Sequence, residues 1–156
     1  MPAKTLIYSF KHTRVQNGTC VRPMIPITLR GTTSFPFIAL LDTGCDATVI
    51  PDKIAQLIGL NMKGRKTKIF GQWDTGTDAI ESTCTMMFLG KLHKNTVILK
   101  DVPVLIAVTK EGYDGDITNN CEMVLGIKGI FDHFDITFEK TEDKIILKQV
   151  SQSKKR

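Results

Sequence analysis

The chain has 156 residues and a mass of 17.4 kDa, the size of one domain that can bury its own core. Hydrophobic residues make up 42% and charged residues 24% of the sequence, which excludes an intrinsically disordered chain. No apolar run is long enough to span a membrane, and the first ten residues lack the apolar core of a signal peptide. We therefore expect a cytoplasmic protein with no membrane partner.

The net charge of +5 comes from two short segments. Four basic residues lie at positions 63–68 and three at 154–156, and without them 14 basic residues stand against 16 acidic ones. A β-barrel that binds nucleic acid through these two segments is one alternative function. A nucleic-acid-binding fold usually spreads its positive charge over a whole face, so we predict no nucleic-acid partner.

Strand patterns and turn residues alternate along the first part of the chain. The pattern predicts strands at 5–13, 22–30 and 36–41. Residues 51–60 differ, because Ile54, Leu57 and Ile58 recur at helical spacing and Gly59 can end a helix. We predict one short helix there, with Pro51 at its first position.

Strand patterns resume after the helix. We predict strands at 67–70, 80–89, 102–108, 123–125, 134–138 and 144–150, with a polar loop at 110–120 and one turn or helical turn at 126–131. Pro103 favours the start of its strand or a sheet edge. The sum is an all-β domain over residues 1–150 with one or two short helices, followed by a basic flexible tail at 151–156.

No metal or cofactor is predicted. No C-x-x-C pair occurs, and the three histidines stand apart, so a zinc site has no support. The carboxylates at 111–116 lack the further ligands of a calcium loop. In a reducing compartment we expect the four cysteines to be free thiols, most of them buried. They are Cys20, Cys45, Cys84 and Cys121.

The segment at 37–51 contains the candidate catalytic residue. Asp42 follows five apolar residues, and Thr43 and Gly44 come directly after it. A buried strand therefore delivers the carboxylate to its end, Gly44 permits a tight turn, and Thr43 can hydrogen-bond within that turn. Apolar residues resume after Asp46, which a simple surface turn does not require.

The stretch 40–50, Leu-Leu-Asp-Thr-Gly-Cys-Asp-Ala-Thr-Val-Ile, resembles the active-site loop of retropepsin-like aspartic proteases, the family of retroviral proteases. The stretch 123–131, Met-Val-Leu-Gly-Ile-Lys-Gly-Ile-Phe, resembles the late apolar-apolar-Gly segment of that family. Residues 69–80 occupy the position of the flap, a hairpin over the cleft. The resemblance covers residues 26–150 and implies a closed, barrel-like acid-protease fold.

The resemblance implies an aspartic endopeptidase that acts on extended peptides or proteins. Such chemistry needs two carboxylates that share one proton, and the chain supplies one, so we expect a homodimer with Asp42 from each subunit at the two-fold axis. Thr43 and Gly44 support the loop. The implied substrate-binding residues are Asp46, Ala47, Gly71, Gln72 and Trp73.

The chain departs from the family pattern at two places. Cys45 stands where Ala is common, and Ile127 stands where retroviral members often place the Arg that pairs with the acidic residue at position 46. That pairing is absent or is replaced by Lys128. The departure keeps an alternative open, a catalytically inactive binding or assembly module with the same fold.

A second Asp-Thr-Gly at 74–76 raises the question of a two-lobed enzyme. No apolar strand leads into it, and it follows Asp42 by too few residues for a second lobe. We predict that it is a turn.

Overall fold

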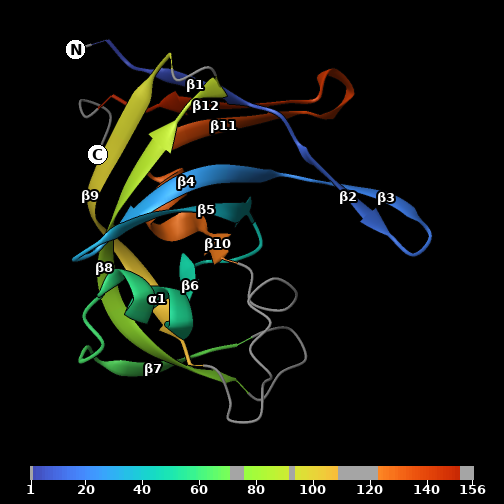
Figure 1. The fold of residues 1–156 in the computed structure, drawn as a ribbon. Coiled ribbons are helices and arrows are strands. Elements are labelled where there is room, and N and C mark those ends of the chain that lie inside the picture. Colours follow the sequence, from blue (N-terminus) through green and yellow to red (C-terminus); the bar gives the residue numbers. More distant parts are fainter. Residues whose placement is uncertain (1, 71–75, 92–93, 109–122, 152–156) are drawn as a thin grey trace.

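The computed structural model describes residues 2–70, 76–91, 94–108 and 123–151 (Figure 1). Within these residues the chain is built mainly of strands, as predicted. The main sheet contains seven of them in the order β4-β5-β10-β6-β9-β8-β7. Their bounds are β4 Met24–Arg30, β5 Ser34–Leu41, β6 Val49–Pro51, β7 Lys66–Ile69, β8 Thr77–Leu89, β9 Thr96–Ala107 and β10 Met123–Leu125.

The main sheet closes on itself. Strand β4 pairs with β5 at one side and with β8 through Thr28↔Met87, so six strands form a ring and β7 extends it. Alternate residues of each strand point into the ring; on β4 these are Ile25, Ile27 and Leu29, none more than 2% exposed. Full burial of each such side chain contributes about 1.5–3 kcal/mol. The expected barrel-like, all-β architecture is thus confirmed.

Strands β8 and β9 form the longest hairpin of the fold. Their register shifts between Cys84 and Met86, and Asp101 has a positive φ of 51° at the same level. This bulge bends the pair, which lets one hairpin serve two sides of the ring. The prediction for Pro103 was wrong in part: β9 begins at Thr96, and Pro103 lies inside it, exposed and opposite Thr83.

One regular helix, α1 (Asp52–Ile58), packs next to β6 and β9. Gly59 ends it in the left-handed conformation with φ 73°, and the N–H groups of Gly59 and Leu60 donate to the Gln56 and Ala55 carbonyls. Pro51 lies just before the helix rather than at its first position. A short irregular helical segment, η2 (Ile127–Phe131), and a single turn, η3 (Lys140–Glu142), complete the helical elements that the structure describes.

A second sheet of three strands lies beside the ring in the order β1-β12-β11 (Figure 1). Its strands are β1 Thr5–Tyr8, β11 Phe134–Glu139 and β12 Lys144–Gln149. Its inner face joins the core through Leu6, Leu147 and Phe134. Phe134 also packs edge-on against Phe88 of β8, with ring centroids 5.2 Å apart.

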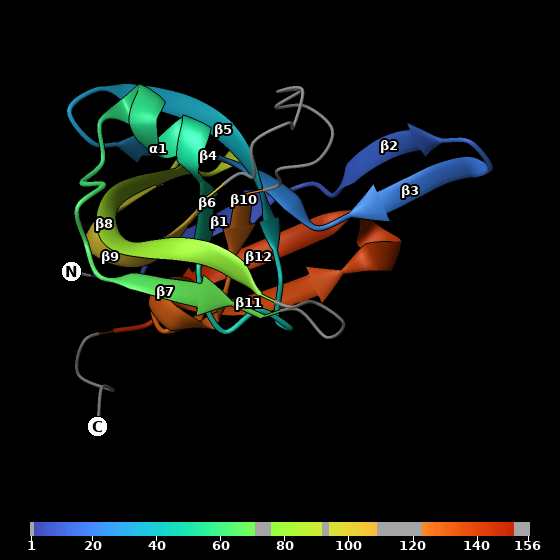
Figure 2. The same ribbon diagram turned by 90° about the horizontal axis from the view of Figure 1, so that it is seen from below.

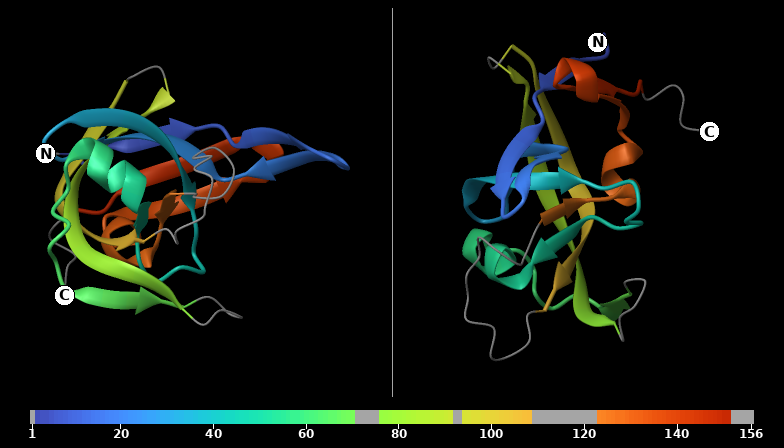
Figure 3. Two further views of the ribbon diagram at one scale, coloured as in Figure 1. Left: turned by 60° about the horizontal axis from the view of Figure 1, so that its bottom comes forward. Right: turned by 90° about the vertical axis from the view of Figure 1, so that its right-hand side faces the viewer.

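Strands β2 (Lys11–Val15) and β3 (Gly18–Arg22) form a hairpin that the sequence prediction missed. It projects from the body in Figures 2 and 3. The single strand predicted at 5–13 is therefore two strands, β1 and β2, which belong to different sheets.

None of the described helices is long and apolar enough to cross a membrane. Tail residues 152–156 lie outside the described residues.

Candidate active site

Asp42 lies at the end of β5, where the sequence places it. Its N–H donates to the Leu125 carbonyl of the neighbouring parallel strand β10 over 3.1 Å. Its carboxylate Oδ1 accepts a hydrogen bond from the Gly44 N–H over 2.8 Å, and the residue is half-buried. Strand and turn together fix the position of the carboxylate and leave part of it open to solvent.

The rest of the loop is bound to the segment after β10. The Ile127 N–H donates to the Cys45 carbonyl and the Lys128 N–H donates to the Asp46 carbonyl, each over 2.9 Å. The two stretches that resemble the family motifs thus lie side by side, although some 80 residues separate them in the sequence.

Thr48 ties these two segments together from inside. It is 1% exposed, and its hydroxyl donates to the Lys128 carbonyl over 3.1 Å and accepts from the Gly126 N–H over 3.2 Å. The sequence prediction did not single out Thr48. Its position among apolar residues, Ala47 and Val49, is the one signal that pointed to a buried hydroxyl.

Gly126 is held where no other residue fits. A Cβ atom there would lie 2.1 Å from the Ala47 carbonyl oxygen and 2.6 Å from that of Cys45. The glycine lets the backbone after β10 lie directly against the Asp42 loop. The apolar-apolar-Gly pattern therefore has a steric cause.

Thr43, Gly44 and Asp46 are exposed, and Ala47 is half-buried. Ile127 is 38% exposed. Within the part of the chain that the structure describes, no side-chain ion pair joins Asp46 to Lys128, and the two residues meet through their main chains alone. The suggestion that Lys128 replaces the family's ion pair is therefore not borne out in this structure.

The predicted flap position is occupied by a hairpin. Strands β7 and β8 pair from Lys66↔Ile80 to Ile69↔Thr77, and Lys68 forms an ion pair with Asp78 over 3.0 Å. The predicted substrate contacts Gly71, Gln72 and Trp73 lie outside the described residues, as do two members of the second Asp-Thr-Gly, Asp74 and Thr75.

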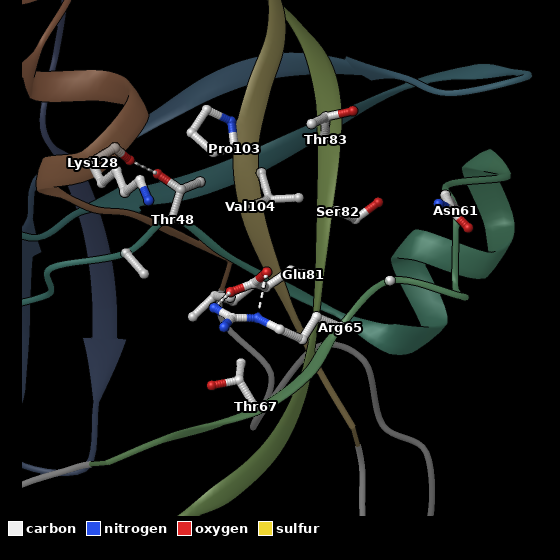
Figure 4. A pocket seen from close by; sticks show the side chains of 13 residues that line it. Thr48, Asn61, Arg65, Thr67, Glu81, Ser82, Thr83, Pro103, Val104 and Lys128 are labelled. Atoms are coloured by element: carbon white, nitrogen blue, oxygen red, sulfur yellow. Dashed lines mark hydrogen bonds and ion pairs between the residues drawn. The ribbon is translucent and has the colours of Figure 1, made fainter.

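A pocket of about 730 Å³ opens beside the loop (Figure 4). Ala47 and Thr48 line one side, the base of the β7–β8 hairpin lines another, and β9 lines a third. Arg65 and Glu81 face each other at its exposed wall, where Arg65 donates two hydrogen bonds, Nε to Oε2 and Nη2 to Oε1. The Arg65 hydrogen bond holds the pKa of the Glu81 carboxyl below its usual value.

Among the described residues, no group of three or more His, Cys, Asp or Glu side chains could hold a metal ion. Cys20 is exposed, Cys45 is half-buried with its Sγ 3.1 Å from the Ala47 carbonyl oxygen, and Cys84 is buried. All three are free thiols. Cys121 and the carboxylates at 111–116 lie outside the described residues.

No protein-family model and no curated protein matches the chain. Its structure is similar to that of a retropepsin-like aspartic protease from Rickettsia conorii, with a TM-score of 0.52 and 16% sequence identity, over 96% of this chain and 94% of that one. It also matches EIAV protease in complex with the inhibitor HBY-793, with a TM-score of 0.41 and 21% identity, over 67% of this chain and 81% of that one. The chain has the fold of a retropepsin-like aspartic protease.

Proposed function

We propose that the protein is an aspartic endopeptidase whose active site contains Asp42 from each of two subunits. The observation that carries the proposal is the position of Asp42. In a fold shared with a retropepsin-like protease, its carboxylate follows β5, accepts a hydrogen bond from Gly44 and remains half-exposed.

The proposed chemistry needs two carboxylates and one water. Two carboxylates on the order of 3 Å apart cannot both ionise, so the pair holds one proton. The ionised Asp42 takes a proton from the water, whose oxygen attacks the scissile carbonyl, while the protonated Asp42 polarises that carbonyl. A proton then passes to the departing amine nitrogen as the C–N bond breaks.

The other predicted site residues receive roles around this centre. Thr43 bonds to its counterpart across the two-fold axis, and Asp46 and Ala47 face the substrate main chain. Gly71, Gln72 and Trp73 cover the substrate, an extended peptide that lies in the cleft as an added strand.

The free thiols of the described cysteines fit a reducing compartment, and we place the protein in the cytoplasm.

The second sheet supports the homodimer. The outer edge of β1 is covered, because Asn95 Nδ2 donates to the Thr5 carbonyl over 2.8 Å and Gly90 lies against Leu6. No described strand pairs with the outer edge of β11, where Phe138 is 39% exposed and Ile136 is half-buried. Such an edge accepts another strand.

The sequence of β11 favours a second β11 as that strand. In an antiparallel pair centred on Ile136, Phe134 lies opposite Phe138 of the partner subunit, and all inner-face apolar residues stay on one side. On the outer face, Asp135 then meets Thr137 of the partner subunit. In a pair centred on Thr137, Asp135 instead faces Glu139 of the partner subunit, and like charges oppose each other.

Replacing Asp42 by Asn tests the proposal. We expect Asp42→Asn to lose pepstatin-sensitive peptide cleavage at mildly acidic pH by at least about a thousandfold, because the amide cannot serve as the base. Asp101→Asn is the matched control, since Asn tolerates the positive φ of that exposed position. If the Asp42→Asn protein cleaves the peptide at the wild-type rate, Asp42 is not the catalytic residue and the proposal is wrong.

The alternative is a binding or assembly module that keeps the fold without proteolysis. Ile127 favours it, because this residue leaves Asp46 without the ion pair that the family resemblance implies. Sedimentation separates the two functions. A chain that stays monomeric at high concentration cannot bring two Asp42 carboxylates together, and the alternative would then hold.

A further inference from the structure

The pocket beside the Asp42 loop has a charge pattern that the proposed chemistry does not use. Of the basic cluster at 63–68, Arg65 lines this pocket, and its outward neighbour Lys66 does not. Lys128 lines the opposite side, from η2 (Figure 4). With Glu81 as the one acidic residue among those lining it, the pocket carries a formal charge of +1.

Both cations have hydrogen-bonding capacity to spare. A guanidinium has five N–H donors, and Arg65 uses two of them on Glu81. The Lys128 side chain is exposed, and its ammonium makes no hydrogen bond or ion pair with the residues that the structure describes. Glu81 already interacts with both cations, since the Arg65 hydrogen bond and the Lys128 charge lower the pKa of its carboxyl. A further carboxylate would use the donors that Glu81 leaves free.

The pocket adjoins the place where a peptide would lie. Ala47 and Thr48 line it and directly follow Asp46, whose carbonyl accepts the Lys128 N–H. Under the proposed function, a peptide strand held at Asp46 runs past Ala47 and Thr48, which line the pocket. Pro103 and Val104 form an apolar wall that can contact side-chain methylenes (Figure 4).

We propose that this pocket selects an acidic side chain, Glu above all, of the bound peptide at a position away from the scissile bond. The inference rests on the proposed peptidase function. Lys128 and Arg65 bind the carboxylate, and the apolar wall favours the longer stem of Glu over Asp. The basic residue at 65 is thereby part of substrate recognition.

Paired fluorogenic peptides that differ only by Glu or Gln, placed at each position in turn, test the proposal. At low salt and pH 6 we expect one position at which Glu raises kcat/KM about two- to fivefold, the upper part of the range for an exposed charge pair. Lys128→Gln should bring that ratio to about one, and Lys66→Gln is the control that keeps it. The preference should disappear below about pH 4, where the peptide Glu is protonated.

A binding measurement separates this inference from the proposed function. The same labelled peptides are titrated with Asp42→Asn protein by fluorescence polarisation, with and without Lys128→Gln. If the wild-type chain cleaves nothing but the Asp42→Asn protein prefers Glu peptides through Lys128, the peptidase proposal fails and the pocket assignment holds. Equal rates and equal binding for Glu and Gln peptides at every position overturn the pocket assignment alone.

Discussion

Thr48 joins the Asp42 loop to the segment that follows β10. Its hydroxyl bonds both to the Gly126 N–H and to the Lys128 carbonyl, and it is almost completely buried. Both main-chain groups lose a partner if the hydroxyl is removed. A buried polar group without a partner costs about 1–3 kcal/mol.

We therefore expect Thr48→Val to lower the free energy of unfolding by about 2–4 kcal/mol in urea titrations, although it preserves the volume of the side chain. Thr48→Ser keeps the hydroxyl and is the matched control, with an expected loss below about 1 kcal/mol. A Thr48→Val protein as stable as Thr48→Ser would show that the two bonds contribute nothing.

The thiols differ in reactivity because they differ in burial. Burial raises the pKa of the Cys84 thiol to about 11, since the charged thiolate is disfavoured away from water. At pH 8 only about one Cys84 in a thousand is then a thiolate. Because folding raises this pKa, the thiol contributes its full stabilisation while the pH is below the pKa that Cys84 has in the unfolded chain. The contribution is lost as the pH rises toward 11.

We expect iodoacetamide at pH 8 to modify exposed Cys20 and to leave Cys84 unmodified in the folded protein, as read by peptide mass spectrometry. Unfolding in urea is the control and should make both thiols reactive. Equal modification rates in the folded protein would contradict the burial of Cys84.

The sequence located Asp42, Thr43 and Gly44 because their motif is local, an apolar strand followed by a tight turn. It did not locate Thr48, since the partners of that hydroxyl lie 78 and 80 residues further along the chain. A single sequence shows which residue types stand in a row, but it does not show which distant main-chain groups need a donor.

At the scale of elements, the edge of β11 is the most consequential feature. Charged residues commonly protect such edges, and here Asp135 and Glu139 flank an apolar centre. In the proposed dimer, two β11 strands pair and join the three-stranded sheets of both subunits into one sheet of six strands. A Lys in place of Ile136 would then lie on the inner, apolar face of that sheet.

We expect Ile136→Lys to shift the protein from dimer to monomer in analytical ultracentrifugation and to abolish peptidase activity, because a buried unpaired charge opposes association. Ile7→Lys is the matched control, since Ile7 is 42% exposed on the outer face of the same sheet. Circular dichroism verifies that both variants fold. If the Ile136→Lys protein remains a dimer, the subunit interface does not lie at β11.

Helix α1 was predictable because its signals are local, with three apolar residues at helical spacing and Gly59 at its end. The β2–β3 hairpin was not, because its strands are largely exposed on both faces and show no apolar alternation. The prediction that Pro103 starts its strand was wrong for a different reason. Pro103 pairs in register with Thr83 of β8, but β6 pairs with β9 only from Leu105 onward. At Pro103, β9 therefore has a paired strand on one side alone, and the sequence does not show this.

In the whole molecule, the proposed active site is shared between two chains. If each site takes Asp42 from two chains, Asp42→Asn chains inactivate wild-type chains by pairing with them. An equimolar mixture should then retain about one quarter of the activity of the same total concentration of wild-type protein, given random pairing.

Asp42→Asn combined with Ile136→Lys provides the control for this mixing experiment. A chain that cannot pair should leave the activity of the added wild-type chains unchanged. Activity that falls only in proportion to the wild-type fraction would show that each chain works alone, in conflict with the two-chain site. The sequence indicated this arrangement through its single usable Asp-Thr-Gly, but the strand that would join the subunits emerged only from the sheet order.

The position of β1 has a further consequence for regulation. Because β1 pairs with β12 of its own chain, Leu6 and Leu147 are fully buried within a single chain. Under the proposed function, dissociation therefore exposes one strand edge and leaves each core intact. Under the proposed function, the separated chain is a folded reserve without activity, and any scaffold that raises the local concentration of chains switches hydrolysis on.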